Sequence, residues 1–588
     1  MGTMTANLPP SPVQSPLSPP LTEDTSILSN DSGRTYDCAS PDVIRRIPKP
    51  QFPVPVFKGE PPPFSLEAQR SVMQWTHERR YFLPDPIWLK EPCTEHVKDT
   101  VWPHLERLGA DYASIEVEFL AEGGFDRVYI IHTNQESSNT AIDYAYRVAL
   151  PVDPYFKTES EVATMELVRH FTNIPVPIVY AYDSSTANPA GVEWILMEKV
   201  KGKKLAETWE SLDYDSKLQL TKTITSWTTQ LSKITAEKIG NIYMRYTETN
   251  LEFYVGRCVN YLLSQENRLT YDVFRGPFKS LEEYYAAVLD IADQDVTSVI
   301  HAFDTGVRFF EPTLDRPKFK GTFLDQSVFY YLEIEYEDKT DEDWKLEQTK
   351  ELEKLSVGIK LLRAALPKLC AKAPASSGAS TTYLFHNDLS RRNIFVDDTG
   401  TPIALIDWEA LPMKPLLCLT DLPDFIDSRE FECEPDEPVD NMKLYKYFNY
   451  SEEEKQEDRE SGARAYAQRM EQYTCTKLRR AHLEELNHIG SPLAMAVWEN
   501  FDELDRDLLD RVLNVSRNVD YHAEWIEDNL GTNEEDEEGG SGEEQEESDE
   551  EDSSDTEVID DVDMEKALED RIRAILGPGG ARFVHLFK

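Results

Sequence analysis

The sequence contains few features that would cross-link or anchor it. Its seven cysteines are scattered and form no C-x-x-C pair, so neither a disulfide framework nor a zinc cage is indicated. No apolar run reaches the roughly 18 residues of a membrane span, and the first residues lack the apolar core of a signal peptide. We therefore expect a cytoplasmic protein with no membrane partner.

Positive charge is also scarce. The chain has 61 Lys and Arg residues against 109 Asp and Glu residues, a formal net charge of -48. This surplus repels phosphate backbones, so it excludes nucleic acid as a general partner and favours cationic ligands or basic proteins. Hydrophobic residues make up 40% of the chain, enough for a sizeable core, so disorder cannot describe the whole protein.

Both ends of the chain are predicted to be disordered. Residues 1–63 form a Pro/Ser-rich arm with 14 of the 36 prolines. Residues 531–563 form an acidic tail, with 18 acidic and no basic residues between 534 and 563, and such a tail suits basic protein partners. Apolar residues at helical spacing predict a short amphipathic helix within 564–588. We favour docking of that helix on its own chain over binding to a partner.

Between the ends we expect a strand-rich part and then a larger helix-rich part. Residues 64–202 are predicted to hold a helical preface, marked by Trp75, Phe82, Trp88 and Trp102, and then a β lobe. Its strands are expected at 117–121, 127–132, 144–150, 178–182 and 194–200, with a helix over 159–171. Residues 203–530 are predicted to be helical over 217–236, 251–264, 280–300, 343–371, 452–487 and 494–510, with a hairpin over 395–406.

The most informative segment is F-H-N-D-L-S-R-R-N at 385–393, followed by I-D-W-E at 406–409. Phosphoryl transfer needs a carboxylate that takes the proton from an attacking hydroxyl. It also needs an amide oxygen and a second carboxylate that hold Mg²⁺. Asp388, Asn393 and Asp407 match these three roles in this order. The alternative is a polar loop before a buried hairpin.

Three segments upstream of this loop together predict a nucleotide-binding site. Gly123 and Gly124 form a turn between two predicted strands, where backbone N–H groups can cover phosphates. In isolation, such a turn is more often an ordinary hairpin. Arg147 on the next strand and Glu161 on the following helix match a phosphate-binding cation and its carboxylate partner, and the alternative for Arg147 is a surface residue of the strand. The apolar strand that leads to Gly202 suits an adenine pocket.

In this order the segments resemble the aminoglycoside phosphotransferase family of the protein-kinase-like superfamily, in its divergent fungal form, from about Phe119 to Pro415. The resemblance implies a two-lobed α+β fold, with a small antiparallel β lobe, a large, expanded helical lobe, and ATP between them. It implies Asp388 as catalytic base and Asn393 and Asp407 as Mg²⁺ ligands. The nucleotide-binding residues it implies are Gly123, Gly124, Arg147, Glu161, Met197, Glu198 and Val200.

The sequence departs from this pattern in three ways. Arg147 replaces the lysine of most kinases, although arginine suits phosphate as a planar donor that cannot lose its charge. The interval from Glu198 to Asp388 is 190 residues, so a large, mostly helical insert is expected there. No A-P-E segment follows Asp407, which disfavours a protein kinase and favours a small-molecule kinase.

The expected reaction is therefore transfer of the γ-phosphate of ATP, with Mg²⁺, to a hydroxyl of a small molecule. From Asp421 to Asp528 there are 28 acidic and 13 basic residues, which favours an amine-bearing acceptor. Charge kept for solubility explains this count equally well. The competing hypothesis is a kinase-fold scaffold protein without turnover, whose acidic tail engages basic partners. Arg147 and the incomplete glycine pattern favour that hypothesis, and the intact catalytic set opposes it.

Overall fold

The computed structural model of the protein describes residues 28–29, 35–36, 43–49, 63–76, 85–135, 140–265, 267–304, 353, 356–367, 370, 381–419, 422–435 and 451–494. The acidic tail, the C-terminal amphipathic helix, most of the Pro/Ser-rich arm and all but the first residue of the helix predicted at 494–510 lie outside these residues. Among the described residues, no helix combines the length and the apolar character needed to span a bilayer.

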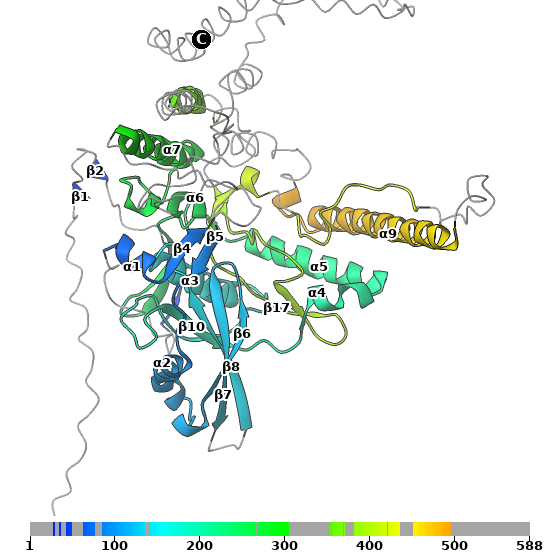
Figure 1. Cartoon of the computed structure of the whole chain (residues 1–588), viewed down its shortest axis with the longest axis horizontal. Helices are drawn as coiled ribbons and strands as arrows, with labels where there is room; N and C mark the ends of the chain where they lie inside the picture. The colour runs from blue at the N-terminus through cyan, green and yellow to red at the C-terminus, as the bar shows by residue number, and fades with distance from the viewer. Residues whose placement is uncertain are drawn as a thin grey trace, which may run out of the picture.

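The first lobe is an antiparallel five-stranded sheet in the order β6-β7-β8-β10-β9. Each strand confirms one expected from β-branched and aromatic runs. Figure 1 shows these strands as a twisted sheet beside the short helix α2. The strands are β6 (Glu116–Glu122), β7 (Asp126–Gln135), β8 (Thr140–Ala149), β9 (Val179–Asp183) and β10 (Glu193–Glu198), and the helices that cover the sheet are α2 (Thr94–Glu106) and α3 (Phe156–Phe171).

The two faces of this sheet join two different cores. Trp194 and Leu196 of β10 pack in one cluster with the apolar side of α2. Ile195, which lies between them, packs with α3 in the larger core that continues into the second lobe. Because successive side chains of a strand point to opposite faces, the consecutive apolar residues Trp194, Ile195 and Leu196 fill both cores.

Helices dominate the second lobe. Helix α5 (Tyr214–Leu231) lies along α9 (Glu452–His488), and α7 (Leu281–Asp304) lies apart from both, as Figure 1 shows. Residues 356–367 are also helical, within the predicted 343–371. These elements confirm four of the expected helices. Local signals set their starts: the Asp213 side chain accepts the Ser216 N–H before α5, and Ser451 and Glu454 form a capping box before α9.

Short elements connect the two lobes and complete the fold. The predicted hairpin is confirmed as β16 and β17, with its turn at Asp398-Thr399-Gly400. The remaining bounds are β1 (Leu28–Ser29), β2 (Thr35–Tyr36), α1 (Leu66–Arg70), β11 (Lys203–Lys204), α4 (Leu205–Thr208), β12 (Thr235–Ala236), β15 (Thr382–Tyr383), β16 (Ile394–Val396), β17 (Pro402–Leu405) and β18 (Lys414–Pro415), with single 3-10 turns at Tyr112–Ser114, Trp209–Ser211, Arg268–Thr270 and Leu416–Cys418.

The helix predicted over 251–264 is wrong. These residues form the strand β14 (Asn250–Val255) and then the single-turn helix α6 (Tyr261–Ser264). Strand β14 lies between β13 (Ile242–Tyr246) and β3 (Val43–Pro48). Its alternate residues Leu251, Phe253 and Val255 belong to the large core, while Glu252 forms ion pairs with Arg46 and Arg245. Burial of every second residue is the pattern of a β-strand, and it explains why this segment is not a helix.

Two predictions about the N-terminal part are also corrected. Residues 43–48 of the arm expected to be disordered form β3, because Ile44 and Ile47 pack on the large core and the backbone pairs with β14. The preface is only partly helical. Trp75 lies in β4 (Met73–Thr76) and Trp88 in β5 (Asp85–Trp88), which pair as a hairpin, and only Trp102 lies in a helix, α2. Phe82 lies outside the described residues.

Glu193 at the start of β10 makes stability depend on pH. Its carboxylate is buried and accepts hydrogen bonds from the Tyr155 N–H at 2.7 Å and the Thr158 hydroxyl at 2.6 Å. Burial raises its pKa from 4.5 to about 7, against the opposing effect of these hydrogen bonds and of Lys157. The folded chain therefore binds this proton more tightly than the unfolded chain, and stability falls as pH rises from about 5 to 8.

We expect Glu193→Gln to remove this part of the pH dependence. Glutamine keeps an acceptor oxygen but carries no charge, so at pH 8 the variant should be more stable than the wild type by about 2 to 3 kcal/mol. Urea unfolding at pH 5 and pH 8 measures the difference, with the exposed Glu207→Gln as control. Equal slopes of stability against pH for wild type and Glu193→Gln would contradict the prediction.

Candidate functional site

The loop at 385–393 folds into a closed turn between β15 and β16. The Asn393 side-chain N–H donates to the Asp388 carboxylate at 2.8 Å and to the Asp388 carbonyl at 3.1 Å. Asp388 is exposed, whereas Asn393 is buried. This arrangement fixes one oxygen of the carboxylate. Because the Asn393 nitrogen is occupied by Asp388, its side-chain oxygen is the atom with the chemistry of a Mg²⁺ ligand.

His386 ties this loop to the strand end that carries Asp407. The backbone N–H of Asp388 points at His386 Nδ1 at 3.3 Å, so Nδ1 is the acceptor and Nε2 carries the proton, which it donates to the Ile406 carbonyl at 3.0 Å. Burial lowers the pKa of His386 to about 4, which keeps the ring neutral. The ring also packs edge-on against Trp408. Sequence reasoning assigned His386 no role, although it stands two residues before the predicted base.

Asp407 lies just beyond β17 in an unusual backbone conformation. Its φ is +70°, in the left-handed region that residues other than glycine rarely adopt. The Ile406 N–H donates to the Asn393 carbonyl at 3.0 Å, and this bond brings the segments of Asp407 and Asn393 together. Burial and the nearby Glu409 raise the pKa of Asp407 to about 6, while Arg147 acts in the opposite direction. Asp407 therefore adds a second carboxylate beside Glu409 in a largely buried region.

Arg147 on β8 is the centre of a buried ion-pair cluster. Its guanidinium contacts the carboxylates of Glu161 on α3 and Glu409, approaches Asp126 at 2.6 Å, and lies 3.8 Å from Asp407. The predicted contact between Arg147 and Glu161 is therefore present, and its role in phosphate binding stays a prediction. Burial would lower the pKa of Arg147, but the carboxylates raise it well above its ordinary value, so the group stays charged.

Glu409 and Lys157 belong to the same cluster, and sequence reasoning missed both. The buried Lys157 Nζ lies 2.5 Å from Glu409 Oε2. Burial alone would raise the pKa of Glu409, but Lys157 and Arg147 lower it to about 2. A signal for Lys157 exists in the sequence, since it precedes Glu161 by four residues and so shares its face of α3. Two cations and several carboxylates thus meet beside Asp407.

The glycine turn (residues 122–126) joins β6 to β7 and is connected to this cluster. The Gly123 N–H donates to the Asp126 carbonyl at 2.9 Å, and the Asp126 carboxylate accepts from Arg147 Nε at 2.7 Å. A Cβ atom at Gly123 would lie 3.0 Å from the Asp126 carboxylate, so a larger residue would push that carboxylate from its place. Gly124 has open space around it. Phe125 stacks on the ring of Tyr261 at 4.1 Å.

The residues predicted for the adenine pocket lie at the end of β10. Met197 and Val200 are half-buried, and Glu198 is exposed. Met197 pairs with Ala145 on β8, so this strand end shares a sheet with Arg147. Gly202 then turns the chain with a φ of +122°, and a Cβ atom there would lie 2.5 Å from the Val396 carbonyl, so only glycine fits.

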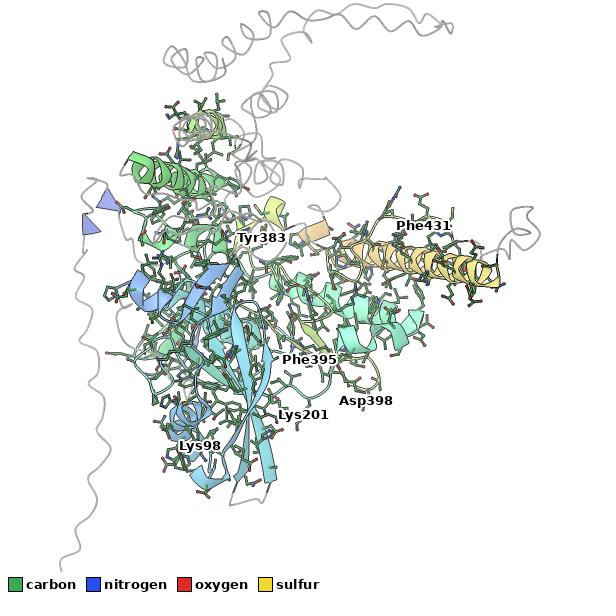
Figure 2. The ribbon with its side chains drawn as sticks, viewed as in Figure 1. Lys98, Lys201, Tyr383, Phe395, Asp398 and Phe431 are labelled. Atoms are coloured by element: carbon green, nitrogen blue, oxygen red, sulfur yellow. The ribbon has the colours of Figure 1, made fainter. Side chains whose placement is uncertain are left out.

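This glycine allows the chain between the lobes to pair with the hairpin after the catalytic loop. Strand β11 pairs with β16, with Lys203 opposite Val396. Figure 2 labels Phe395 and Asp398 on the hairpin and Lys201 beside it. The Asp398 carboxylate lies 3.4 Å from Lys203 Nζ, exposed to solvent. The short strand β11, which follows the first lobe, is therefore held directly against the strand that follows Asn393.

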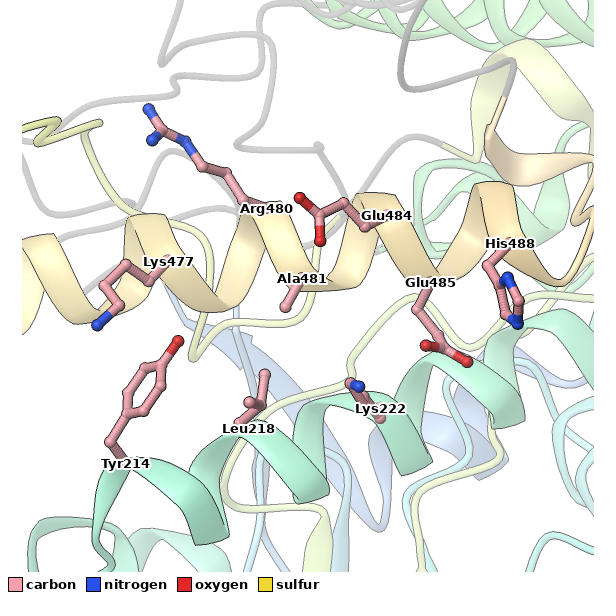
Figure 3. A pocket seen from close by; sticks show the side chains of 9 residues that line it. All are labelled: Tyr214, Leu218, Lys222, Lys477, Arg480, Ala481, Glu484, Glu485 and His488. Atoms are coloured by element: carbon pink, nitrogen blue, oxygen red, sulfur yellow. The ribbon is translucent and has the colours of Figure 1, made fainter.

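The described residues of the second lobe line a groove and a smaller cavity. A groove of about 490 Å³ runs between α5 and α9, where Figure 3 shows Lys477 facing the ring of Tyr214, 4.1 Å from its centroid. A smaller cavity of about 190 Å³ contains Arg391 of the catalytic loop, together with the acidic residues Asp424, Asp427 and Glu471. Only the smaller cavity includes a residue of the 385–393 loop among its described lining residues.

Comparisons with known proteins identify the family of the chain. A family model described as the phosphotransferase enzyme family matches residues 116–418. A subtelomeric hrmA-associated cluster protein of Aspergillus fumigatus is 39% identical over 102 residues, which are 17% of this chain and 19% of that protein. The protein of Kluyveromyces lactis named "altered inheritance of mitochondria protein 9, mitochondrial" is 25% identical over 174 residues, 26% of each chain. The chain thus matches about a fifth to a quarter of the length of these relatives.

The solved structures matched at low similarity include two phosphotransferases. The gentamicin complex of APH(2")-IIa is 11% identical, with a TM-score of 0.28, and the match covers 71% of this chain and 94% of that chain. The macrolide 2'-phosphotransferase MphH from Brachybacterium faecium is 14% identical, with a TM-score of 0.24, covering 71% and 98%.

Proposed function

Because the chain belongs to the phosphotransferase enzyme family, we propose that it transfers the γ-phosphate of ATP, with Mg²⁺, to a hydroxyl group of a small molecule. Membership confirms the family resemblance and the two-lobed, kinase-like α+β fold predicted from the sequence. One observation carries the proposal. The hydrogen-bonded Asp388–Asn393 turn lies beside the segment of Asp407, and Asp407 faces the buried cation Arg147.

In this proposal Asp388 orients the acceptor hydroxyl and takes its proton, because it is the exposed carboxylate of the loop and the Asn393 amide holds one of its oxygens in place. Arg147 neutralises charge on the transferred phosphate, with Glu161 and Glu409 fixing its guanidinium. In the glycine turn the Gly123 N–H already donates to the Asp126 carbonyl, so Gly124, which has open space around it, would face the phosphates. Positioning and charge neutralisation then supply most of the rate.

Asn393 and Asp407 are the residues that would hold Mg²⁺. Within the described ranges, no three His, Cys, Asp or Glu side chains are grouped to hold a metal by themselves. This fits magnesium, which proteins bind through one or two carboxylates together with the phosphates of the nucleotide. When bound, the ion would draw negative charge from the phosphates.

We propose an amine-bearing acceptor. The cavity beside the catalytic loop contains three carboxylates, those of Asp424, Asp427 and Glu471, which would attract an ammonium group. Arg391 partly offsets them, since it lies 3.5 Å from Asp424 and 3.9 Å from Glu471. Screening amino sugars and amino alcohols against neutral and anionic alcohols would test this choice. Turnover only of an anionic acceptor would contradict it.

We also propose a cytoplasmic location. The relative from Kluyveromyces lactis carries a mitochondrial name, and its match covers only a quarter of either chain. Expression of the full chain with a C-terminal fluorescent protein would show diffuse cytoplasmic signal if the proposal holds. Signal that coincides with a mitochondrial dye would overturn it.

Calorimetry of ATP binding tests the proposed nucleotide site. We expect the full chain to bind ATP in a Mg²⁺-dependent way and Asp407→Ala to lose about 100-fold in Mg²⁺-ATP affinity, because the carboxylate ligand is gone. The matched control is Asp398→Ala, an exposed carboxylate on the adjoining hairpin, with unchanged affinity. If the wild type binds no nucleotide, the scaffold alternative with its acidic tail for basic proteins replaces the enzyme proposal.

A further inference from the structure

Tyr261 lies in the long interval between Glu198 and Asp388 and reaches back into the site. It is the first residue of α6, and the Asn260 side chain caps this helix by accepting the Leu262 N–H at 2.9 Å. The same Asn260 amide donates to the Tyr284 hydroxyl on α7 at 2.6 Å. The position of the Tyr261 ring is therefore set by the second lobe.

The two ends of the Tyr261 side chain contact two different parts of the site. Its ring is stacked on Phe125 of the glycine turn, with centroids 4.1 Å apart and an interplanar angle of 8°. Its hydroxyl donates to Glu409 Oε1 at 2.9 Å, and the other Glu409 oxygen receives Arg147 and Lys157. One side chain thus joins the turn that covers phosphates to the carboxylate that fixes the phosphate-binding cation.

Phe125 lies at the edge of a small apolar cluster. Among the described residues this cluster has Met73, Leu150 and Val152 as buried members, with Trp75, Trp88 and Tyr261 packed against them. The Phe125 carbonyl accepts the Leu150 N–H at 2.8 Å, but this bond holds the backbone and not the ring. The parallel aromatic stack on Tyr261 is therefore a side-chain contact that joins the tip of the turn to the second lobe.

We infer that Tyr261 is a positioning residue that holds the glycine turn closed over the nucleotide phosphates and keeps Glu409 aligned on Arg147. This inference rests on the proposed function and gives the long insert a specific task within it. The ring acts on the turn and the hydroxyl acts on Glu409, so the two contributions separate. Tyr261→Phe removes only the hydrogen bond, whereas Tyr261→Leu removes both contacts.

Hydrogen exchange of the full chain without nucleotide tests the contact with the turn. In Tyr261→Leu, the amides of residues 122–126 should exchange about 3- to 10-fold faster than in the wild type, and in Tyr261→Phe they should stay near the wild-type rate. The control is Tyr112→Leu, which removes another aromatic contact, with Trp102, beyond the opposite end of β6. Unchanged exchange at the turn in Tyr261→Leu would overturn the inference, as would a rise spread through the whole lobe with a lower unfolding midpoint.

Nucleotide affinity and kinetics then test the effect on the site. Tyr261→Leu should raise the KM for ATP about tenfold, and Tyr261→Phe should restore most of this loss. A Tyr261→Leu chain with faster exchange but wild-type ATP affinity would overturn the positioning role. A wild-type chain that binds no ATP would overturn the proposed function instead, and exchange at the turn would then decide by itself whether Tyr261 holds it.

Discussion

Asp388→Asn is expected to lower phosphoryl transfer by about 10²- to 10⁴-fold while leaving the affinity for Mg²⁺-ATP within about twofold. The asparagine oxygen can still accept the Asn393 N–H that now reaches the carboxylate at 2.8 Å, so the loop should keep its shape. What the variant lacks is a group that can take a proton from the acceptor hydroxyl. The change should therefore appear in kcat and not in nucleotide binding.

The measurement is single-turnover transfer to the acceptor found by screening, or ATP turnover to water if no acceptor is found, with calorimetry of Mg²⁺-ATP on the same preparations. Asp398→Asn, on the exposed hairpin turn, serves as matched control and should keep wild-type rate and affinity. Transfer at the wild-type rate by Asp388→Asn would show that another group is the base. A joint loss of affinity and rate would show that Asp388 holds the site together instead.

Arg147→Ala is expected to destabilise the fold by about 3 to 5 kcal/mol. Arg147 is buried, and its removal leaves the carboxylates of Asp126 and Glu161 without their cation, while Glu409 retains Lys157. A buried carboxylate without a partner is costly because it loses its hydration without gaining an opposite charge. Urea unfolding at pH 7 measures the loss. At lower pH it should shrink, because the orphaned carboxylates then take up protons.

Two further variants separate charge from shape in this cluster. Arg147→Lys keeps the charge but loses the planar fork, so it should recover part of the stability and little of the nucleotide affinity. Adding Glu161→Gln to Arg147→Ala should also recover part of the stability, because one unpaired charge is removed. If Arg147→Ala unfolds within about 1 kcal/mol of the wild type, the buried cluster is not an interacting unit.

The residues of the proposed chemistry were readable from the sequence because their roles are encoded locally. Asp388 and Asn393 occur in one loop, and Asp407 ends a hairpin whose turn is marked by Asp398-Thr399-Gly400. The strands of the first lobe were equally clear, because β-branched and aromatic residues alternate with turn residues over short distances. An apolar pattern that repeats every two residues, or every three to four, can be recognised in a short segment without information about the rest of the chain.

Two predictions of secondary structure were wrong because the correct assignment depends on residues far away in the sequence. The segment over 251–264 has enough apolar residues for a helix, and its assignment as β14 depends on β3, which lies about two hundred residues earlier. For the same reason β3 was hidden in an arm predicted to be disordered. An edge strand with two arginines has no obvious core of its own until its partner strand is known.

The sequence by itself indicated the family resemblance, the order of the lobes, the loop that carries Asp388 and Asn393, and the hairpin end that carries Asp407, since each motif is a short run of residues. Only the tertiary structure decided that Glu409 binds an arginine 262 residues away, that Lys157 shares this carboxylate, and that Tyr261 of the insert stacks on the glycine turn. The physical reason is that burial selects these partners. A buried charge is stable only when an opposite charge lies beside it in the folded chain. That partner can be far away in the sequence, so sequence spacing does not predict it.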